Sequence, residues 1–376
     1  MNTTAKLLAP LTKGGHHFRN RIAMAPMSRR RATGDAMPTD NMRIYYGQRA
    51  SAGLIIVENT AVAPNGVGYQ HNPGIFSAAQ QKVWKQITDE VHQQGGTIFI
   101  QLVHTGRIGH PANQQGLPTV GASNVAAAGM VGIPGGNHVP LPVPDTLTTA
   151  GAAAMVQAHV DAAIAAMEAG FDGVEIHGAH GFLPAQFLHP ATNQRTDKYG
   201  GSIVNRSRFL MEIMEGVAIA IGKEHTGLRL SPFSGLNDLP TYPEELATHQ
   251  YLAEELDKLG ILYIHLSDQS VNGQPPIPHA YLEDLRQRFH QLIILAGGYT
   301  PATAEARLQE GLADIIAFGR PFISNPDLVE RIRYQLPLAP ADPETFYQGG
   351  DRGLIDYPTY QIIKENCGLA DDLQPA

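Results

Sequence analysis

The chain has 376 residues, of which 43% are hydrophobic and 16% are charged, and its formal net charge at pH 7 is -8. This composition is typical of a compact globular protein with a large core, and it argues against intrinsic disorder. The acidic balance, without a long run of lysine and arginine, argues against nucleic-acid binding. We expect the short basic run Arg29–Arg31 to be a solvated or ion-paired local feature.

The cysteine content and the amino-terminal residues limit which covalent cross-links, metal sites and cellular locations we expect. The single cysteine, Cys367, excludes an intramolecular disulfide and a CxxC metal site. The first residues lack the apolar stretch and cleavage site of a secretory signal, and no stretch approaches the roughly 18 consecutive apolar residues of a membrane span. We therefore expect a soluble cytoplasmic protein without a membrane partner, either a monomer or a homo-oligomer.

Short apolar runs alternate with segments of helical periodicity along the whole chain. The runs are continuously apolar, which is typical of parallel strands covered on both faces. We predict eight strands, at residues 21–27, 53–59, 96–102, 172–178, 228–232, 262–268, 292–298 and 314–319. This α/β pattern predicts a (β/α)8 TIM barrel with its active site at the carboxyl ends of the strands. An open doubly wound sheet is the alternative, but neither GxGxxG nor GxxxxGK[ST] is present.

Helix signals fall between the predicted strands. Residues 78–94 have helical periodicity and are followed by two glycines that end the helix. A further helix is predicted over about residues 150–169. The pairs Thr300–Pro301 and Asn325–Pro326 each predict an N-cap followed by proline in the first helical turn.

One connection is too long for an ordinary crossover. The Gly/Pro-rich excursion 103–148, after the third strand, is expected to be a cap or lid over the barrel mouth rather than a second domain. Residues 1–19 are expected to cover the bottom of the barrel, and the tail 336–376 to run along its surface. No linker or repeat divides the chain, so we predict a single domain over residues 1–376.

Polar residues and glycines gather at the predicted carboxyl ends of the strands. They are Ser28, Asn59, Gln101, His177, His180, Arg229, Asp268, Gly297–Gly298 and Gly319–Arg320. The last two pairs follow the seventh and eighth strands, where barrels of this class commonly bind phosphate. Backbone N–H groups and a guanidinium suit that role, although tight turns alone would also use glycine. We therefore expect a ligand that carries a phosphate group.

Longer motifs occur in a characteristic order. They include NRIAMAPMSR (20–29), GGTIFIQLVHTGR (95–107), NQRTDKYGGSIVNRSRF (193–209) and AFGRPFISNPDL (317–328). In this order the chain resembles the Old Yellow Enzyme family of FMN-dependent NAD(P)H ene-reductases. The third motif, placed between two predicted strands, is highly specific, whereas the pattern HxxH alone would be weak.

The resemblance implies non-covalent FMN at the barrel mouth and NADPH or NADH as reductant. The residues that it assigns to FMN are Pro26, Met27, Ser28, Asn59, Gln101, Arg229, Gly297, Gly298, Gly319, Arg320 and Tyr347. Arg229 would lie beside the flavin N1, where a buried cation stabilises the negative charge that reduction creates. For Arg229 alone, an ion pair within the barrel is the alternative.

Two histidines, His177 and His180, stand at the end of the fourth predicted strand. Two imidazoles three residues apart at this place can converge on one oxygen. By the resemblance, they would hold the carbonyl or nitro oxygen of an electrophilic alkene, so that its β-carbon accepts hydride from the flavin. A metal site would need a third ligand, which no spacing suggests, and a lone histidine would more often belong to the core.

Several positions depart from the family pattern. Phe182 stands where the family most often has the tyrosine that is taken to protonate the substrate α-carbon, and a phenyl ring cannot donate a proton. Water or another group, such as Tyr69, would then supply that proton. Val103 replaces a common tryptophan and should reshape the substrate pocket. Asn59 replaces a small residue, and Ser28 replaces a common threonine.

Other functions remain open beside ene-reduction of an α,β-unsaturated carbonyl or nitroalkene. Loss of the tyrosine could favour quinones, nitro esters or nitroaromatics, whose reduction needs no α-carbon protonation. A non-redox aldolase or isomerase that uses only the phosphate site is less favoured, because no predicted strand ends in a Schiff-base lysine. A non-catalytic flavin-binding protein is the last alternative.

Overall fold

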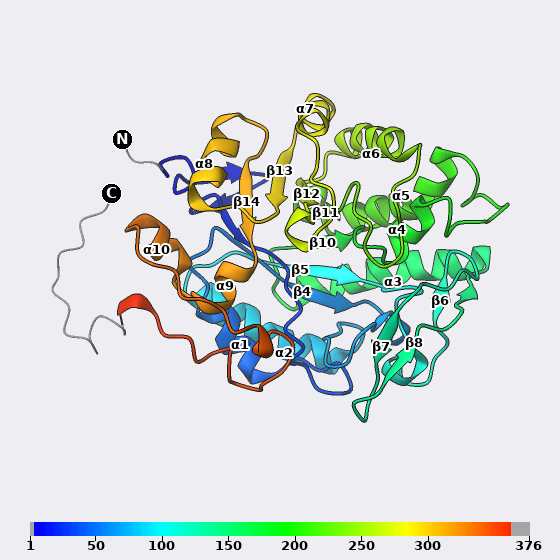
Figure 1. The fold of residues 1–376 in the computed structure, drawn as a ribbon, viewed down its shortest axis with the longest axis horizontal. Coiled ribbons are helices and arrows are strands. Elements are labelled where there is room, and N and C mark those ends of the chain that lie inside the picture. Colours follow the sequence, from blue (N-terminus) through cyan, green and yellow to red (C-terminus); the bar gives the residue numbers. More distant parts are fainter. Residues whose placement is uncertain (1–3, 362–376) are drawn as a thin grey trace.

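A closed barrel of eight parallel strands forms the centre of the computed structural model, which describes residues 4–361 (Figure 1). The strand order around the barrel is β10-β11-β12-β13-β14-β3-β4-β5. These strands are β3 (Ile22–Met24), β4 (Leu54–Ala61), β5 (Ile98–Val103), β10 (Gly173–His177), β11 (Thr226–Leu230), β12 (Tyr263–Ser267), β13 (Leu292–Ala296) and β14 (Ile315–Phe318). Each predicted strand overlaps one of them, so the predicted TIM barrel is confirmed.

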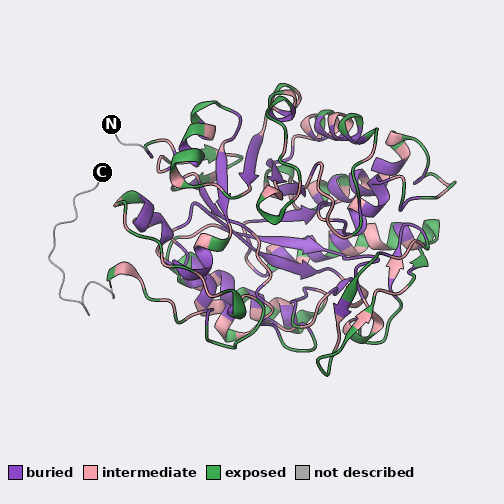
Figure 2. Ribbon diagram, in the orientation of Figure 1, coloured by how far each residue is buried: buried purple, intermediate pink, exposed green. Residues whose placement is uncertain are grey.

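Every residue of the eight barrel strands is buried, which accounts for their continuously apolar sequences (Figure 2). Alternate strand residues face an outer layer of helices and the barrel interior. The helices around the strands are α1 (Asp40–Gly47), α2 (Ala78–Gln93), α3 (Thr149–Glu168), α4 (Leu183–Leu188), α5 (Ile203–Ile221), α6 (Glu245–Leu259), α7 (His279–Arg288), α8 (Pro301–Gln309), α9 (Arg320–Ser324) and α10 (Leu328–Arg333). Among them, α4 and α9 are short helices that follow the carboxyl ends of β10 and β14.

A small hairpin closes the amino-terminal end of the barrel. Its strands are β1 (Leu11–Lys13) and β2 (His16–Phe18). Phe18 is fully buried and packs with Leu54 and Tyr263, which begin two of the barrel strands. The expectation that the first residues cover the bottom of the barrel is therefore confirmed for the described residues from 4 onward.

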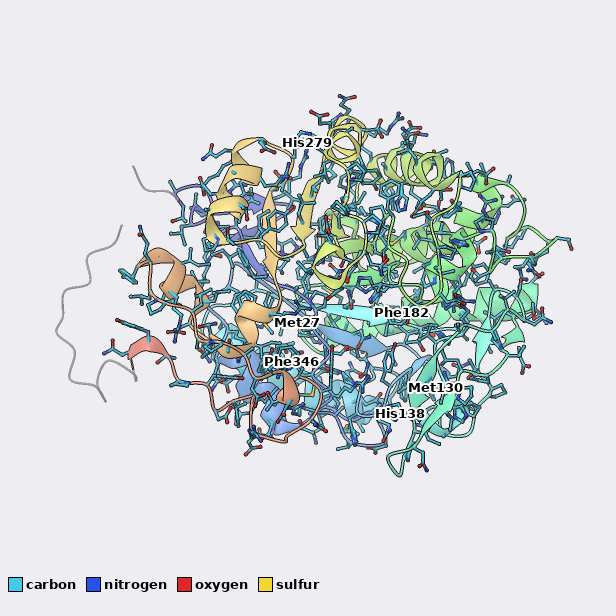
Figure 3. All side chains as sticks on the ribbon, viewed as in Figure 1. Met27, Met130, His138, Phe182, His279 and Phe346 are labelled. Atoms are coloured by element: carbon cyan, nitrogen blue, oxygen red, sulfur yellow. The ribbon has the colours of Figure 1, made fainter. Side chains whose placement is uncertain are left out.

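The excursion after β5 contains four short strands and joins α3. They are β6 (Val120–Gly121), β7 (Met130–Gly132), β8 (His138–Pro140) and β9 (Asp145–Thr146), with β7 and β8 paired as a hairpin. Met130 and His138 of this hairpin are labelled in Figure 3. Ile108 and Ala127 of the excursion are buried against Val103 and Phe182 at the carboxyl ends of the strands. Its function as a lid stays a prediction.

The helix predicted over residues 150–169 is α3, and it belongs to the outer layer. Among residues 4–361 it is the one helix whose length and composition alone would allow it to cross a membrane. Its buried face, which includes Ala162, Ala163 and Ala166, lies in the main hydrophobic core. This packing is that of an ordinary barrel helix.

One of the two predicted helix starts is confirmed and the other is wrong. Thr300 caps α8 through a capping box with Thr303. Asn325 instead ends α9, and the N-cap of α10 is Asp327. The Asn325 side chain bonds the backbone of Ala339, accepting from its N–H at 2.8 Å and donating to its carbonyl at 3.2 Å. This tertiary contact takes the place of the predicted cap.

The expectation of a solvated or ion-paired basic run at Arg29–Arg31 is wrong. Arg29 and Arg31 are buried, and within the described chain none of the three guanidiniums forms an ion pair with a carboxylate. Their guanidiniums donate to backbone carbonyls of the carboxyl-terminal segment, including Arg29 to Gly353 at 2.7 Å and Arg31 to Thr345 at 2.9 Å. They thereby hold this segment against the barrel mouth. Cys367 lies outside the described residues.

Gly53 provides a test of the contact between β3 and β4. A Cβ at this position would lie 2.0 Å from the carbonyl oxygen of Asn20. We expect Gly53→Ala to lower the free energy of unfolding by about 1–3 kcal/mol, because the backbone of two barrel strands must move apart. Denaturant unfolding measures this change. Gly34→Ala, which would contact nothing within 4 Å, is the control and should change stability by less than about 0.5 kcal/mol.

Candidate active site

A cavity of about 660 Å³ opens at the carboxyl ends of the barrel strands. All of the predicted site residues line it except Val103, which packs behind Phe182. Met27, Phe182 and Phe346, labelled in Figure 3, reach it from the end of β3, the start of α4 and the carboxyl-terminal segment. The cavity is therefore built by segments that are far apart in the sequence.

Arg229 supplies a buried positive charge at this cavity. Its Nη2 donates to Ser267 Oγ at 3.1 Å, and its Nε has no hydrogen-bond partner. No carboxylate lies within ion-pair distance of it in the part of the chain that the structure describes, so the alternative of an ion pair for Arg229 is wrong. Burial lowers the pKa of Arg229, and the nearby Glu175 opposes this shift. The guanidinium suits an electron-rich ligand.

A buried network that the sequence did not predict surrounds Glu175, near Arg229. Its carboxylate accepts from Gln101 Nε2 at 2.7 Å and from His265 Nδ1 at 2.8 Å. Burial would raise the pKa of Glu175, but His265, Arg229 and Gln101 hold it below its usual value. Because the Gln101 amide nitrogen faces Glu175, the Gln101 carbonyl oxygen is left to accept from a ligand N–H.

Glycines and an arginine form the predicted phosphate end of the cavity. Gly298 has a left-handed backbone with φ of +70°, and a Cβ there would lie 2.3 Å from Val271. Within residues 4–361, the backbone N–H groups of Gly298 and Gly319 have no recorded acceptor. Arg320 is exposed and donates to Asn272 Oδ1 at 2.7 Å. These donors can hold a phosphate group.

Ser28 and Asn59 meet on the opposite wall. Ser28 Oγ donates to Asn59 Oδ1 at 2.8 Å, and Asn72 Nδ2 donates to the same oxygen at 2.7 Å. The amide nitrogen of Asn59 and the lone pairs of Ser28 are therefore left for a ligand.

His177 ends β10 as a neutral imidazole. Its pKa is lowered well below the usual value by burial, and His180 and Arg229 lower it further. Its Nδ1 accepts from the backbone N–H of Ala179 at 3.3 Å, which places the proton on Nε2. Within the described residues, Nε2 has no protein partner, so this N–H is available to a ligand.

His180 lies beside His177, with the ring centroids 5.1 Å apart. Its backbone is left-handed, with φ of +57°, and this conformation is held by a hydrogen bond from its N–H to Ser231 Oγ at 2.8 Å. Burial, followed by Arg229, lowers its pKa well below the usual value. In the part of the chain that is described, no third metal-ligating side chain joins the pair.

Aromatic rings and an arginine frame the entrance. The Arg30 guanidinium lies over the rings of Tyr69 and Tyr347, 4.8 Å and 5.0 Å from their centroids. Phe182 is buried deeper, with its ring centroid 4.8 Å from that of His177. Tyr69 and Phe182 are therefore both close to any molecule that occupies the cavity.

The donor set fits flavin mononucleotide. A buried guanidinium without a carboxylate partner suits the acceptor-rich pyrimidine edge, and the open N–H groups near Arg320 suit the phosphate. Among the residues 4–361, no lysine lines the cavity, which removes the Schiff-base alternative. Fold and donors together define a barrel of the flavin-binding class.

Comparison with known proteins identifies the family within this class. The model of the NADH:flavin oxidoreductase / NADH oxidase family matches residues 6–339. 12-oxophytodienoate reductase 1 of Oryza sativa subsp. japonica is 36% identical over 365 residues, which are 96% of this chain and 94% of that protein. Morphinone reductase is 44% identical with a TM-score of 0.91, covering 94% of this chain and 96% of that chain. The old yellow enzyme homologue from Zymomonas mobilis is 39% identical with a TM-score of 0.89, covering 94% and 99%.

The chain therefore belongs to this FMN oxidoreductase family, the Old Yellow Enzyme family, and is a flavin-dependent oxidoreductase. This membership excludes two alternatives, a non-redox barrel enzyme and a non-catalytic flavin-binding protein.

Arg229 provides a test of cofactor electrostatics. We expect Arg229→Gln to lower the midpoint potential of bound FMN by roughly 30–60 mV, because a buried cation favours the negatively charged reduced state. Arg229→Lys keeps the charge and should restore most of the difference. Spectroelectrochemical titration of the holoenzymes measures both values. Equal potentials for the Gln variant and the wild type would contradict the assigned position of the charge.

Proposed function

We propose that the protein is an ene-reductase that uses NADPH or NADH and acts on α,β-unsaturated carbonyl compounds or nitroalkenes. Bound FMN would take hydride from the nicotinamide and pass it to the β-carbon of the alkene. The observation that carries this proposal is the pair of neutral imidazoles, His177 and His180, beside the buried charge of Arg229. Nicotinamide and alkene would use the same cavity in turn, which accords with the missing dinucleotide fingerprint.

The histidines would bind the substrate oxygen by neutral N–H donation. As hydride reaches the β-carbon, negative charge moves onto that oxygen, and a fixed donor binds it more strongly than the starting carbonyl. Neutral imidazoles suit this task because they donate without bringing a second and third buried cation beside Arg229.

Proton delivery to the α-carbon would come from Tyr69. Phe182 cannot donate a proton, whereas Tyr69 lines the cavity and its hydroxyl interacts with Asn237. Burial raises the pKa of Tyr69, with Arg30 opposing the shift, so the hydroxyl stays protonated at neutral pH. Arg30 over the ring would stabilise the phenolate after transfer.

Phe182 also favours a second candidate function. Quinones, nitro esters and nitroaromatics accept hydride without protonation of a carbon, so a site with phenylalanine in the usual place of the tyrosine would process them unimpaired. Steady-state comparison of kcat/KM for an enone and a quinone on the same enzyme separates the two functions. A quinone preference of more than about a hundredfold would favour the second.

A phenol tests the histidine pair. We expect a simple phenol to give a long-wavelength charge-transfer band with the bound flavin, since both imidazoles would hold its oxygen. His177→Ala should weaken phenol affinity by roughly tenfold or more, because it removes one donor to a charged oxygen. His279→Ala, a change to an exposed histidine on α7, is the matched control and should leave the titration unchanged. An undiminished affinity in His177→Ala would contradict the oxygen-binding role.

Tyr69→Phe tests the proton donor. We expect it to lower kcat for enone reduction by about 10²–10⁴-fold, the usual contribution of a positioned acid. The rate of flavin reduction by NADPH should not change, because no proton from Tyr69 enters that step. Stopped-flow measurement of both half-reactions checks this. If the enone half-reaction and its pH profile were unchanged, the donor would be water or another group.

A further inference from the structure

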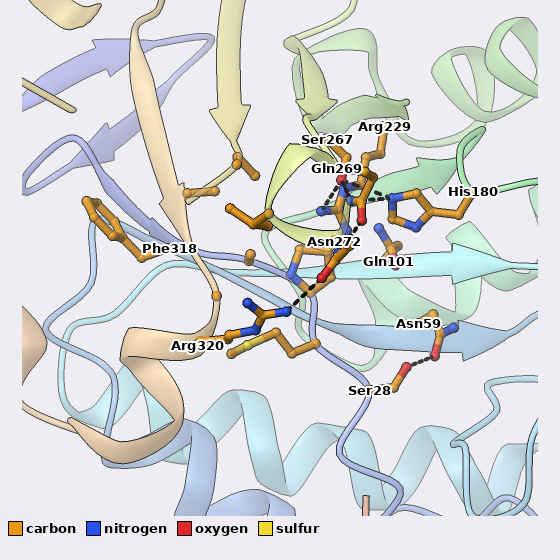
Figure 4. Close-up of a pocket in the computed structure, with 18 of the residues that line it drawn as sticks. Ser28, Asn59, Gln101, His180, Arg229, Ser267, Gln269, Asn272, Phe318 and Arg320 are labelled. Atoms are coloured by element: carbon orange, nitrogen blue, oxygen red, sulfur yellow. Dashed lines mark hydrogen bonds between the residues drawn. The ribbon is translucent and has the colours of Figure 1, made fainter. Parts of the chain in front are cut away.

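A continuous line of hydrogen bonds connects the predicted phosphate end of the cavity to His180. It runs from Arg320 through Asn272, Gln269 and Ser267 to the imidazole, as the dashed lines in Figure 4 show. The distances along it are 2.7, 2.6, 2.6 and 2.9 Å. The three middle residues have no part in the predicted site, although all three line the cavity.

In the part of this line between Arg320 and Ser267, each hydrogen bond can have only one donor and one acceptor. A guanidinium donates and cannot accept, so the atom of Asn272 that faces Arg320 must be the carbonyl oxygen. The amide nitrogen of Asn272 then faces Gln269 and donates to its Oε1. The amide nitrogen of Gln269 is left to donate to Ser267 Oγ. The orientation of two amides is thus decided by one arginine.

The hydroxyl of Ser267 completes the line. It accepts from Gln269 Nε2 at 2.6 Å and from Arg229 Nη2 at 3.1 Å, and these two bonds use both of its lone pairs. Its own proton can then only be donated to His180 Nε2, which lies 2.9 Å away. Gln269 Nε2, also a donor, lies 3.3 Å from the same nitrogen, and this contact agrees with an unprotonated His180 Nε2.

We propose that Ser267, Gln269 and Asn272 are positioning residues that place the single ring proton of His180 on Nδ1. Among the described residues Nδ1 has no protein partner, and the imidazole lines the cavity. His180 would then present Nδ1–H and His177 would present Nε2–H to the same oxygen. The role of this arrangement in binding a substrate oxygen rests on the proposed function. The position of the proton on His180 does not depend on it.

Substitution of the exposed residue Asn272 should reverse the donor and acceptor roles along these hydrogen bonds. In Asn272→Asp the new carboxylate still accepts from Arg320 but cannot donate to Gln269. Gln269 would turn its amide to donate to the carboxylate, so that its oxygen faces Ser267 and takes the hydroxyl proton. His180 Nε2 would then lose its donor and carry the proton itself. Gln269→Glu should have the same effect directly, because both of its oxygens are acceptors.

The test is ¹⁵N NMR of the holoenzyme labelled at histidine, with the His180 signals assigned by their loss in His180→Asn. In the wild type we expect Nδ1 protonated and Nε2 unprotonated. In Asn272→Asp and Gln269→Glu we expect a proton on Nε2, together with a roughly tenfold loss of phenol affinity. Gln274→Glu adds the same charge to the same loop, where its oxygen accepts from Gly235, and should leave both readouts at wild-type values.

Each outcome decides the proposal. A wild-type His180 with its proton on Nε2 overturns it, and so does an unchanged tautomer in both variants. The same switch in Gln274→Glu would assign the effect to charge alone and would also overturn it. If the tautomers follow the prediction while no enone is turned over, the positioning line stands and the proposed ene-reduction fails.

Discussion

The buried positive charge of Arg229 governs the groups at the mouth of the barrel. It contributes to the lowered pKa of His177, His180 and His265, and it helps to keep Glu175 ionised. Around this buried cation the histidines are neutral donors, whereas Arg30 and Arg320 lie at the entrance and at the phosphate end of the cavity. Such a field favours negative charge on a ligand beside the guanidinium while leaving the imidazoles free to bind an uncharged oxygen.

The barrel was predictable because its physics is simple. A strand covered on both faces must be apolar along its whole length, and eight such runs were visible. Many of the residues that line the cavity were found for a related reason, since the strand ends of a closed barrel converge whatever the loops do. Val103 does not line the cavity of the described chain and packs in one cluster with Phe182, so its part in the substrate pocket stays a prediction. The remaining assignments came from the family resemblance.

Residues whose roles depend on a distant partner were not predictable. The run Arg29–Arg31 was expected at the surface or in ion pairs, but its partners are carbonyls more than three hundred positions away in the chain. Asn325 signalled a cap that a contact with Ala339 replaced. Glu175 did leave a signal, because a carboxylate in the middle of a buried apolar strand requires partners inside the barrel. Ser267 and Gln269 left none, since small polar residues after a strand are common.

The loop that carries Asn272 contains a sequence that can change chemically as the protein ages. Asn272 is exposed and is followed by Gly273, whose left-handed backbone has φ of +81°. An asparagine before glycine is prone to spontaneous deamidation, because the next backbone nitrogen can attack the side-chain amide without hindrance from a side chain. In this fold the Gly273 N–H donates to the Ser270 carbonyl at 3.0 Å, so the attack requires this turn to open first. Deamidation would put a carboxylate where the line of hydrogen bonds needs a donor. Deamidation of one surface residue, Asn272, would in this way move the ring proton of His180 without any change in fold.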